Sequence, residues 1–209
     1  MSLKLKQLLE KIAKEKAPGP APTFSALHLL HTMELVAEKH IGRTKLSEEL
    51  KIGEGAVRTI IARLKEAGLI SISKTGCSLT VKGRKLWDEY RKIVDKKFEI
   101  GKCELINAKH NFAVLIKNCG HKVKTGMEQR DAAVKIGAKG AVTIVFKYGR
   151  FMVPSVSDDF SRDYPATAKQ ISKLLQPEEN DVIIISGADT LDLARQGVMA
   201  AAWTLIDDC

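Results

Sequence analysis

The hydrophobic pattern of this 209-residue chain changes near Phe98, and this change most constrains how the chain can fold. Before it, apolar residues recur every three or four positions, as on one face of an amphipathic helix. After it, helical patterns alternate with runs that are almost wholly apolar, at 112–116, 141–146 and 182–185. Continuous apolar strands are typical of a sheet that is covered on both faces. We therefore expect two folded parts with different architectures.

The first part begins with an arm. Leu5, Leu8, Leu9 and Ile12 share one face of a helix that we expect over 3–14, and three prolines within 17–22 separate it from the next helical segment. A helix of about a dozen residues is marginal alone in water. Its apolar face should therefore dock either on the rest of the chain or on a second copy. The predicted domains are 1–22 (arm and link), 23–98 and 99–209.

Residues 23–98 show the order helix, helix, turn, helix, hairpin, helix. The periodicity predicts helices over four segments, 23–40, 43–50, 54–67 and 82–97. Gly68 is placed to end the third helix. Two short strands are expected over 69–73 and 78–81, joined by a turn at 74–77 in which Gly76 suits a hairpin. Such an order predicts a winged helix-turn-helix domain.

The segment "RTKLSEELKIGEGAVRTIIARLKEAGLISISKTGCSLTVKGRKLW" resembles the core of archaeal and bacterial winged-helix transcriptional regulators, and the resemblance extends over 23–94. It implies a winged helix of three helices with a β-hairpin wing, bound to double-stranded DNA. One departure is Lys51, where such proteins often have glycine. Because a left-handed conformation costs a lysine about 1 kcal/mol, we expect a turn of slightly different shape there.

Charge is divided unequally between the two parts. Residues 1–98 hold 20 Lys and Arg against 11 Asp and Glu, a net charge of +9, whereas residues 99–209 hold 14 of each. Such an asymmetry indicates one module that binds a polyanion and a neutral module with another task. Charge alone leaves open whether the polyanion is DNA, RNA or anionic lipid.

The third helix of the winged-helix segment supplies the predicted DNA contacts. At about 100° per residue, Gly55, Thr59 and Ala62 lie opposite the buried stripe, with Arg58 and Arg63 on either side. Small residues let a helix enter the major groove, where Arg58 and Thr59 are the expected base contacts. Phosphate contacts are expected from basic and polar residues near the hairpin and the second helix: Arg43, Lys45, Lys74, Thr75, Lys82 and Arg84. The alternative is an ordinary solvated helix face.

Residues 99–209 predict a small α/β domain with a mixed sheet in the order β-α-β-β-α-β-α. Helices are expected over 125–136, 166–175 and 190–206, with a hairpin partner at 150–153. The segments "GMEQRDAAVKIGAKGAVTIVFKYGRFMVP" and "DVIIISGADTLDLARQGVMAAAWTLI" are similar to uncharacterised archaeal proteins in which an α/β domain follows a winged helix. That resemblance implies a regulator but supplies no ligand.

Two junctions between strands and helices are the candidate ligand site of this second part. Helix N-termini at the carboxyl ends of parallel strands attract anions, so we expect the two junctions to share one pocket for a small anionic effector. Its predicted residues are Lys122, Lys124, Thr125, Gly126, Ser186, Gly187, Asp189 and Thr190. The alternative is a pair of tight turns capped by their own side chains. Thr125 and Glu128 have the spacing of a capping box.

Other functions find less support in the sequence. Cys77, Cys103, Cys119 and Cys209 are scattered without zinc spacing and are expected to be free thiols, with no metal and no cofactor. The absence of a long apolar run predicts no membrane span, no secretory leader and a cytoplasmic protein. No grouping of catalytic residues is recognisable, so we expect no enzyme activity.

Three hypotheses are compatible with these patterns. The first is a homodimeric transcriptional regulator whose second domain senses a small ligand or dimerises. The second is a metabolic enzyme with an autoregulatory winged helix, and the third is a winged helix that binds proteins within a transcription or replication assembly. DNA binding that is salt-sensitive and sequence-selective favours the first hypothesis. Turnover by residues 99–209 favours the second.

Overall fold

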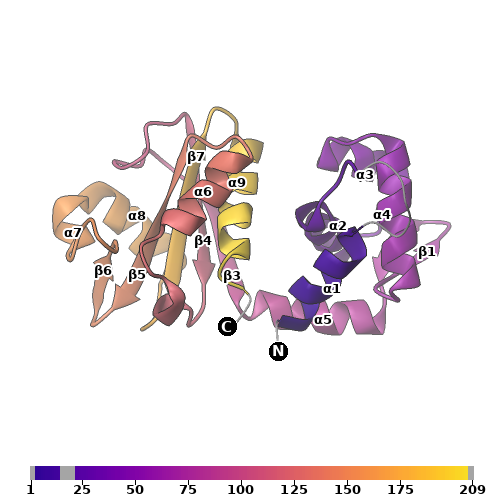
Figure 1. Ribbon diagram of the computed structural model, residues 1–209, viewed down its shortest axis with the longest axis horizontal. Coiled ribbons are helices and arrows are strands. Elements are labelled where there is room, and N and C mark those ends of the chain that lie inside the picture. The colour runs from indigo at the N-terminus through magenta and orange to yellow at the C-terminus, as the bar shows by residue number, and fades with distance from the viewer. Residues whose placement is uncertain (1–2, 15–21, 207–209) are drawn as a thin grey trace. The chain divides into compact units, whose positions relative to one another are not determined.

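The computed structural model describes residues 3–14 and 22–206 of the chain (Figure 1). The chain divides into two compact units, Met1–Arg91 and Lys92–Cys209. The cut expected near Phe98 falls inside a strand of the second unit, β3 (Val94–Ile100). Apart from Pro22, the proline-rich link at 17–22 lies outside the described residues.

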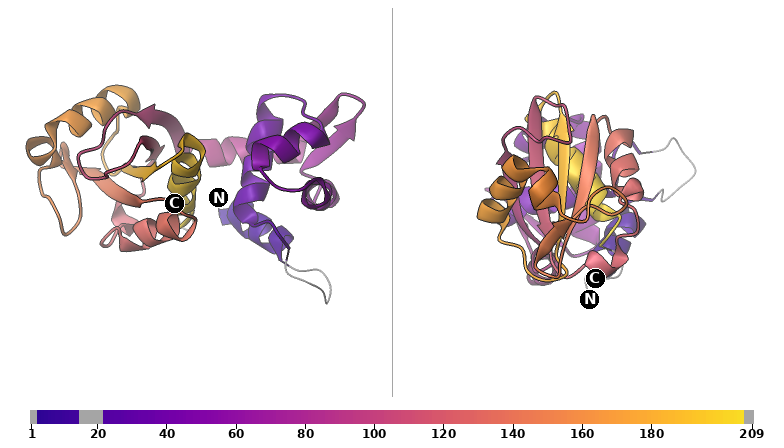
Figure 2. Two further views of the ribbon diagram at one scale, coloured as in Figure 1. Left: turned by 90° about the horizontal axis from the view of Figure 1, so that it is seen from above. Right: turned by 90° about the vertical axis from the view of Figure 1, so that its left-hand side faces the viewer.

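The first unit has the predicted winged-helix order. Its elements are α1 (Leu3–Ala13), α2 (Ala26–Glu38), α3 (Arg43–Leu50), α4 (Glu54–Glu66), β1 (Ile70–Ser73), β2 (Gly76–Leu79) and α5 (Val81–Arg91). The arm helix α1 contacts α2 and α5 of its own unit and buries Leu5 and Leu9, which settles where its apolar face docks. Figure 2 shows the β1–β2 hairpin standing at the side of the helices of this unit. The last helix ends at Arg91, so its predicted extension to residue 97 is wrong.

Two turns of the first unit depend on unusual backbone conformations. Lys51, which follows α3, adopts the left-handed conformation with φ 54° and ψ 37°. The expectation of a differently shaped turn is therefore wrong, and the lysine takes the conformation for which related sequences use glycine. In the hairpin, Gly76 has φ 121°, and a Cβ there would lie 2.7 Å from the Ile41 carbonyl carbon. This close approach pairs Ile41 with Cys77 and anchors the hairpin to the helices.

The second unit contains a five-stranded sheet in the order β3-β4-β7-β5-β6. Besides β3 its strands are β4 (His110–Ile116), β5 (Gly140–Lys147), β6 (Arg150–Met152) and β7 (Val182–Ala188). Every neighbouring pair is antiparallel, so the predicted mixed sheet is wrong. The reason is that β7 inserts between β4 and β5, and these two strands run in the same direction without pairing to each other.

Helices cover both faces of this sheet, as the continuous apolar strands predicted (Figure 1). They are η1 (Gly120–Lys122), α6 (Met127–Lys135), α7 (Phe160–Asp163), α8 (Pro165–Leu175) and α9 (Leu191–Trp203). On one face, Leu115, Ile183 and Ile185 pack with Ile171 of α8 in one apolar cluster. On the other, α6 and α9 contact β5 and β7. None of the described helices combines the length and apolarity needed to cross a membrane.

The three cysteines among the described residues differ in state. Cys77 and Cys103 are buried free thiols, as predicted. Cys119 is disulfide-bonded, so the expectation of a free thiol is wrong at this position. Cys209 lies outside the described residues.

Candidate nucleic-acid interface

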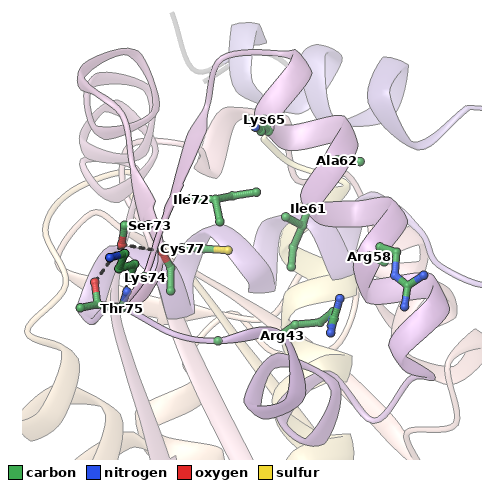
Figure 3. A pocket seen from close by; sticks show the side chains of 12 residues that line it. Arg43, Arg58, Ile61, Ala62, Lys65, Ile72, Ser73, Lys74, Thr75 and Cys77 are labelled. Carbon is green, nitrogen blue, oxygen red and sulfur yellow. Dashed lines mark hydrogen bonds between the residues drawn. The ribbon is translucent and has the colours of Figure 1, made fainter.

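A groove of about 550 Å³ lies between α4, the β1–β2 hairpin and the start of α3 (Figure 3). Four basic residues line it: Arg43, Arg58, Lys65 and Lys74. Apolar side chains lie between these cations, from Ile61 and Ala62 on the helix and from Ile72 and Cys77 on the hairpin. The groove therefore combines positive charge with an apolar surface. This combination suits a polyanion that presents less polar groups beside its anionic groups.

The amphipathic pattern of α4 determines which side chains reach the groove. Val57, Ile60 and Leu64 are fully buried against the unit's core. This leaves Gly55, Arg58, Thr59 and Ala62 exposed, as the helical-wheel argument predicted. Thr59 donates its hydroxyl to the Gly55 carbonyl oxygen at 3.1 Å, so this side chain lies close to its own helix. The exposed ridge of α4 is consequently low, which allows close approach by a large partner.

The basic residues of the groove differ in how they are neutralised. Within the described part of the chain, no ion pair involves Arg58, Lys65 or Lys74, whereas Arg43 Nε lies 3.7 Å from Glu54 Oε2. Lys45, also predicted to contact phosphate, pairs instead with Glu48 at 2.9 Å and Glu49 at 3.8 Å. The hydrogen bond to Glu48 and the two nearby carboxylates raise the pKa of Lys45. Three cations without an ion pair among the described residues therefore line the groove.

Arg63 serves the arm rather than the exposed ridge. Its Nη1 donates to three carbonyl oxygens at the end of α1, those of Ile12 at 2.9 Å, Ala13 at 3.3 Å and Lys14 at 3.0 Å. Its guanidinium also lies 5.2 Å from the centre of the Phe24 ring. A cation at a helix C-terminus stabilises the partial negative charge there. We therefore correct the prediction that Arg63 flanks the recognition surface.

Lys82 and Arg84 also hold helix ends. Lys82 Nζ donates to the Ala67 carbonyl oxygen at 2.8 Å, just after α4, and Arg84 Nη2 donates to that of Ala37 at 3.2 Å, near the end of α2. Both side chains are exposed, so contact with phosphate stays a prediction for them.

The hairpin tip is braced by hydroxyl contacts. Thr75 Oγ1 lies 2.8 Å from Ser73 Oγ and 3.0 Å from His40 Nδ1, which ties the turn to the end of the α2 region. Lys74 is thereby presented at an ordered tip. Sequence reasoning missed Lys65 and Ile72, although Lys65 follows Arg58 by two helical turns and therefore shares its side of α4.

The two junctions proposed to share a ligand pocket lie at opposite ends of α9 in the second unit. Gln129, in the first turn of α6, donates to Thr204 Oγ1 at 2.6 Å at the end of α9, whereas Thr190 caps the start of α9. The length of α9, about 20 Å, separates these starts. The strands agree, because Ile116 pairs with Val182 and His110 with Ala188. The shared pocket is therefore wrong.

The individual junction residues have structural partners or lie exposed. The Thr190 hydroxyl accepts a hydrogen bond from the Leu193 amide at 3.3 Å. The Thr125 hydroxyl accepts one from the Met127 amide at 3.3 Å. Ser186 is buried, and its hydroxyl donates to the Gly140 carbonyl oxygen. A hydrogen bond from Lys139, with its charge, lowers the pKa of Asp189. Gly126 is the N-cap of α6 with φ 78°, which replaces the expected capping box. Of the others, Lys124 is exposed, Lys122 half-buried and Gly187 packed beside Ile106.

Comparison with known proteins gives a different result for each unit. Residues 25–94 match the family model of the CggR N-terminal DNA binding domain, and residues 106–205 match that of a domain of unknown function, DUF4443. No curated protein sequence matches the chain. A similar solved structure is that of hypothetical protein PH0730 from Pyrococcus horikoshii OT3, with a TM-score of 0.69 and 27% identity over 87% of this chain and 92% of that one. The chain is thus similar to a DNA-binding domain over most of its first unit.

Proposed function

We propose that this protein is a sequence-specific regulator of transcription that binds double-stranded DNA through α4 and the β1–β2 hairpin. The observation that carries the proposal is the convergence of Arg58, Lys65 and Lys74 on one groove beside the low exposed ridge of α4. Its position in a segment that matches a DNA-binding domain family supports the same conclusion.

In the proposed binding mode, α4 enters the major groove and the hairpin tip contacts the phosphate backbone. Gly55, Thr59 and Ala62 allow α4 into the major groove, where Arg58 reaches a guanine edge or a phosphate. Lys74 at the hairpin tip and Lys65 contact phosphates and contribute affinity without sequence preference. Arg43 joins them when phosphate replaces Glu54 as its partner.

We further propose that the second unit makes the protein a homodimer and that it acts by binding rather than catalysis. A single winged helix contacts few base pairs, and a two-fold pair supplies a second half-site. Residues 92–209 hold 17 Lys and Arg against 15 Asp and Glu, a net charge of only +2, so two copies can approach through this unit with little long-range repulsion. A small anionic effector stays a proposal for this unit, now without the shared pocket.

Selection of bound duplexes from a random DNA library by the full chain tests the proposed function. We expect enrichment of one site that the protein binds more tightly than random duplex, with affinity falling steeply as salt rises. Arg58→Ala should reduce this preference, whereas Lys169→Ala, an exposed lysine of α8, should not. Equal binding to every duplex, or tighter binding to RNA or to anionic vesicles, would overturn the proposal.

A further inference from the structure

We propose that Ile72, together with Ala62, recognises the 5-methyl group of thymine and so determines sequence specificity at one position of the bound site. This inference rests on the proposed function, because it assigns a chemical class to one contact of the same groove. It concerns the apolar part of the groove, which the phosphate and guanine contacts leave unexplained.

Ile72 is a large apolar side chain in an unusual setting. It lies two residues from Ile70, and the two side chains therefore share a face of β1. Ile70 is 2% exposed, whereas Ile72 is 51% exposed. Figure 3 shows Ile72 directed from the hairpin across the groove toward α4, where Ala62 and Ile61 lie. Along β1 the buried side chains thus end at Ile70, and Ile72, the next apolar side chain on that face, lines the groove.

The chemistry of the major groove identifies what such a surface can contact. Base edges there present hydrogen-bond donors and acceptors, and the thymine methyl is the apolar group among them. Ala62 lies on the exposed ridge of α4 that the proposed binding mode places in the major groove, so Ile72 and Ala62 meet the base edge from two sides. Cytosine would place its N4 amino group near the same surface, where an unsatisfied donor is costly.

The charged neighbours explain why the contact is made at a defined place. Arg58 and Lys65 extend from α4, and Lys74 from the hairpin tip, so cations surround the apolar pair in the groove. Phosphates held by Lys65 and Lys74 fix the register of the duplex. A base edge is then held against the apolar pair, and burial of one methyl group gives about a fourfold gain in affinity.

The test removes the methyl group from the DNA and its partner from the protein. Each thymine of the selected site is replaced in turn by deoxyuridine, and dissociation constants are measured by fluorescence anisotropy with the full chain. One replacement should weaken binding about fourfold. In the Ile72→Ala variant, the deoxyuridine substitution at that position should change the dissociation constant little. The unaltered protein should bind a site with 5-methylcytosine at that position better than a site with cytosine there. Val81→Ala removes an apolar side chain that is 91% exposed and should retain the full penalty.

Three outcomes overturn the inference. If no deoxyuridine replacement weakens binding, no thymine methyl is contacted. If Ile72→Ala weakens binding but leaves the deoxyuridine penalty intact, Ile72 contacts the sugar or another group. If no site is selected at all, the proposed function itself fails, and this result is distinct from the other two because no sequence-specific complex then exists.

Discussion

Arg58 and Arg63 show how neighbouring residues of one helix acquire different roles. Both were predicted to flank the recognition surface, since they lie on either side of the exposed ridge of α4. Arg58 lines the groove without an ion pair in the described part of the chain. Arg63 is half-buried and bonded to the last carbonyl groups around the end of α1. The difference comes from the end of the arm, whose carbonyl groups accept hydrogen bonds from Arg63 and are not among the residues that line the groove with Arg58.

Paired substitutions test this division. Arg58→Ala should weaken binding to the selected site by about 1–3 kcal/mol and leave the melting temperature unchanged. Arg63→Ala should lower the stability of the first unit by about 1–3 kcal/mol, because charge-assisted hydrogen bonds to the arm are lost. Fluorescence anisotropy measures the change in binding, and calorimetry measures the change in stability. The assignment is wrong if Arg58→Ala destabilises the protein as much as Arg63→Ala does.

Lys74 is predicted to contribute affinity without sequence preference. Lys74→Ala should weaken binding to selected and random duplexes by the same factor and reduce the slope of log affinity against log salt by about 1. Lys45→Ala is the matched control, because its ammonium is already paired with Glu48 and Glu49, and it should change the slope less. A larger effect of Lys74→Ala on the selected site alone would indicate base contact instead.

At the scale of elements, the cap at the start of α2 should be sensitive to pH. The Ser25 amide donates to Nδ1 of His28 at 3.0 Å, so the histidine accepts a hydrogen bond that the protonated ring cannot accept. Burial lowers the pKa of His28 below its ordinary value of 6.5. The folded state therefore favours the neutral ring, whereas the unfolded chain binds a proton near its ordinary pKa.

Stability should accordingly fall as the pH drops below about 6.5, because protonation favours the unfolded chain. His28→Gln keeps an acceptor at the same helical position, as in a capping box, and should remove part of this pH dependence. The difference between the two proteins in unfolding free energy, measured by urea denaturation from pH 8 to pH 5, isolates His28 from the other histidines. Parallel pH profiles for the two proteins would show that the cap is not coupled to pH.

At the scale of the whole molecule, the proposed homodimer needs a surface through which two copies make contact. The arm and the last helix of the first unit use their apolar faces internally, since Leu5, Leu9, Trp87 and Tyr90 are buried. Trp87 and Tyr90 also stack on each other with ring centres 5.2 Å apart. These elements are therefore poor candidates for the contact between copies, which we assign to the second unit.

The full chain should have twice the mass of one chain in light scattering at micromolar concentration. The selected DNA should contain two half-sites whose centres lie about 34 Å apart, one helical turn, or a multiple of it. Arg58→Ala should leave the mass unchanged, because the groove is not the contact between copies. A monomer both free and on DNA would contradict the proposed dimer.

Sequence patterns alone predict the winged-helix order, the exposed ridge of α4 and the burial of the second sheet on both faces. Each follows from local periodicity, since apolar spacing reports which faces of an element are buried. Local periodicity does not determine strand direction, because a strand that is covered on both faces has the same apolar pattern in either direction. The charged segment before Ile100 was predicted to be helical as far as residue 97, yet pairs with β4 as a strand.

Tertiary structure alone decided the contacts between distant segments. Arg63 and the end of the arm are about 50 residues apart along the chain, and helical periodicity gives no information about such a pair. The insertion of β7 between β4 and β5 likewise separated the two predicted ligand junctions. The sequence shows Ile72 only as an apolar residue of an expected strand. The tertiary structure buries Ile70 and leaves Ile72 exposed in the groove. Local patterns specify faces, whereas packing specifies which faces meet.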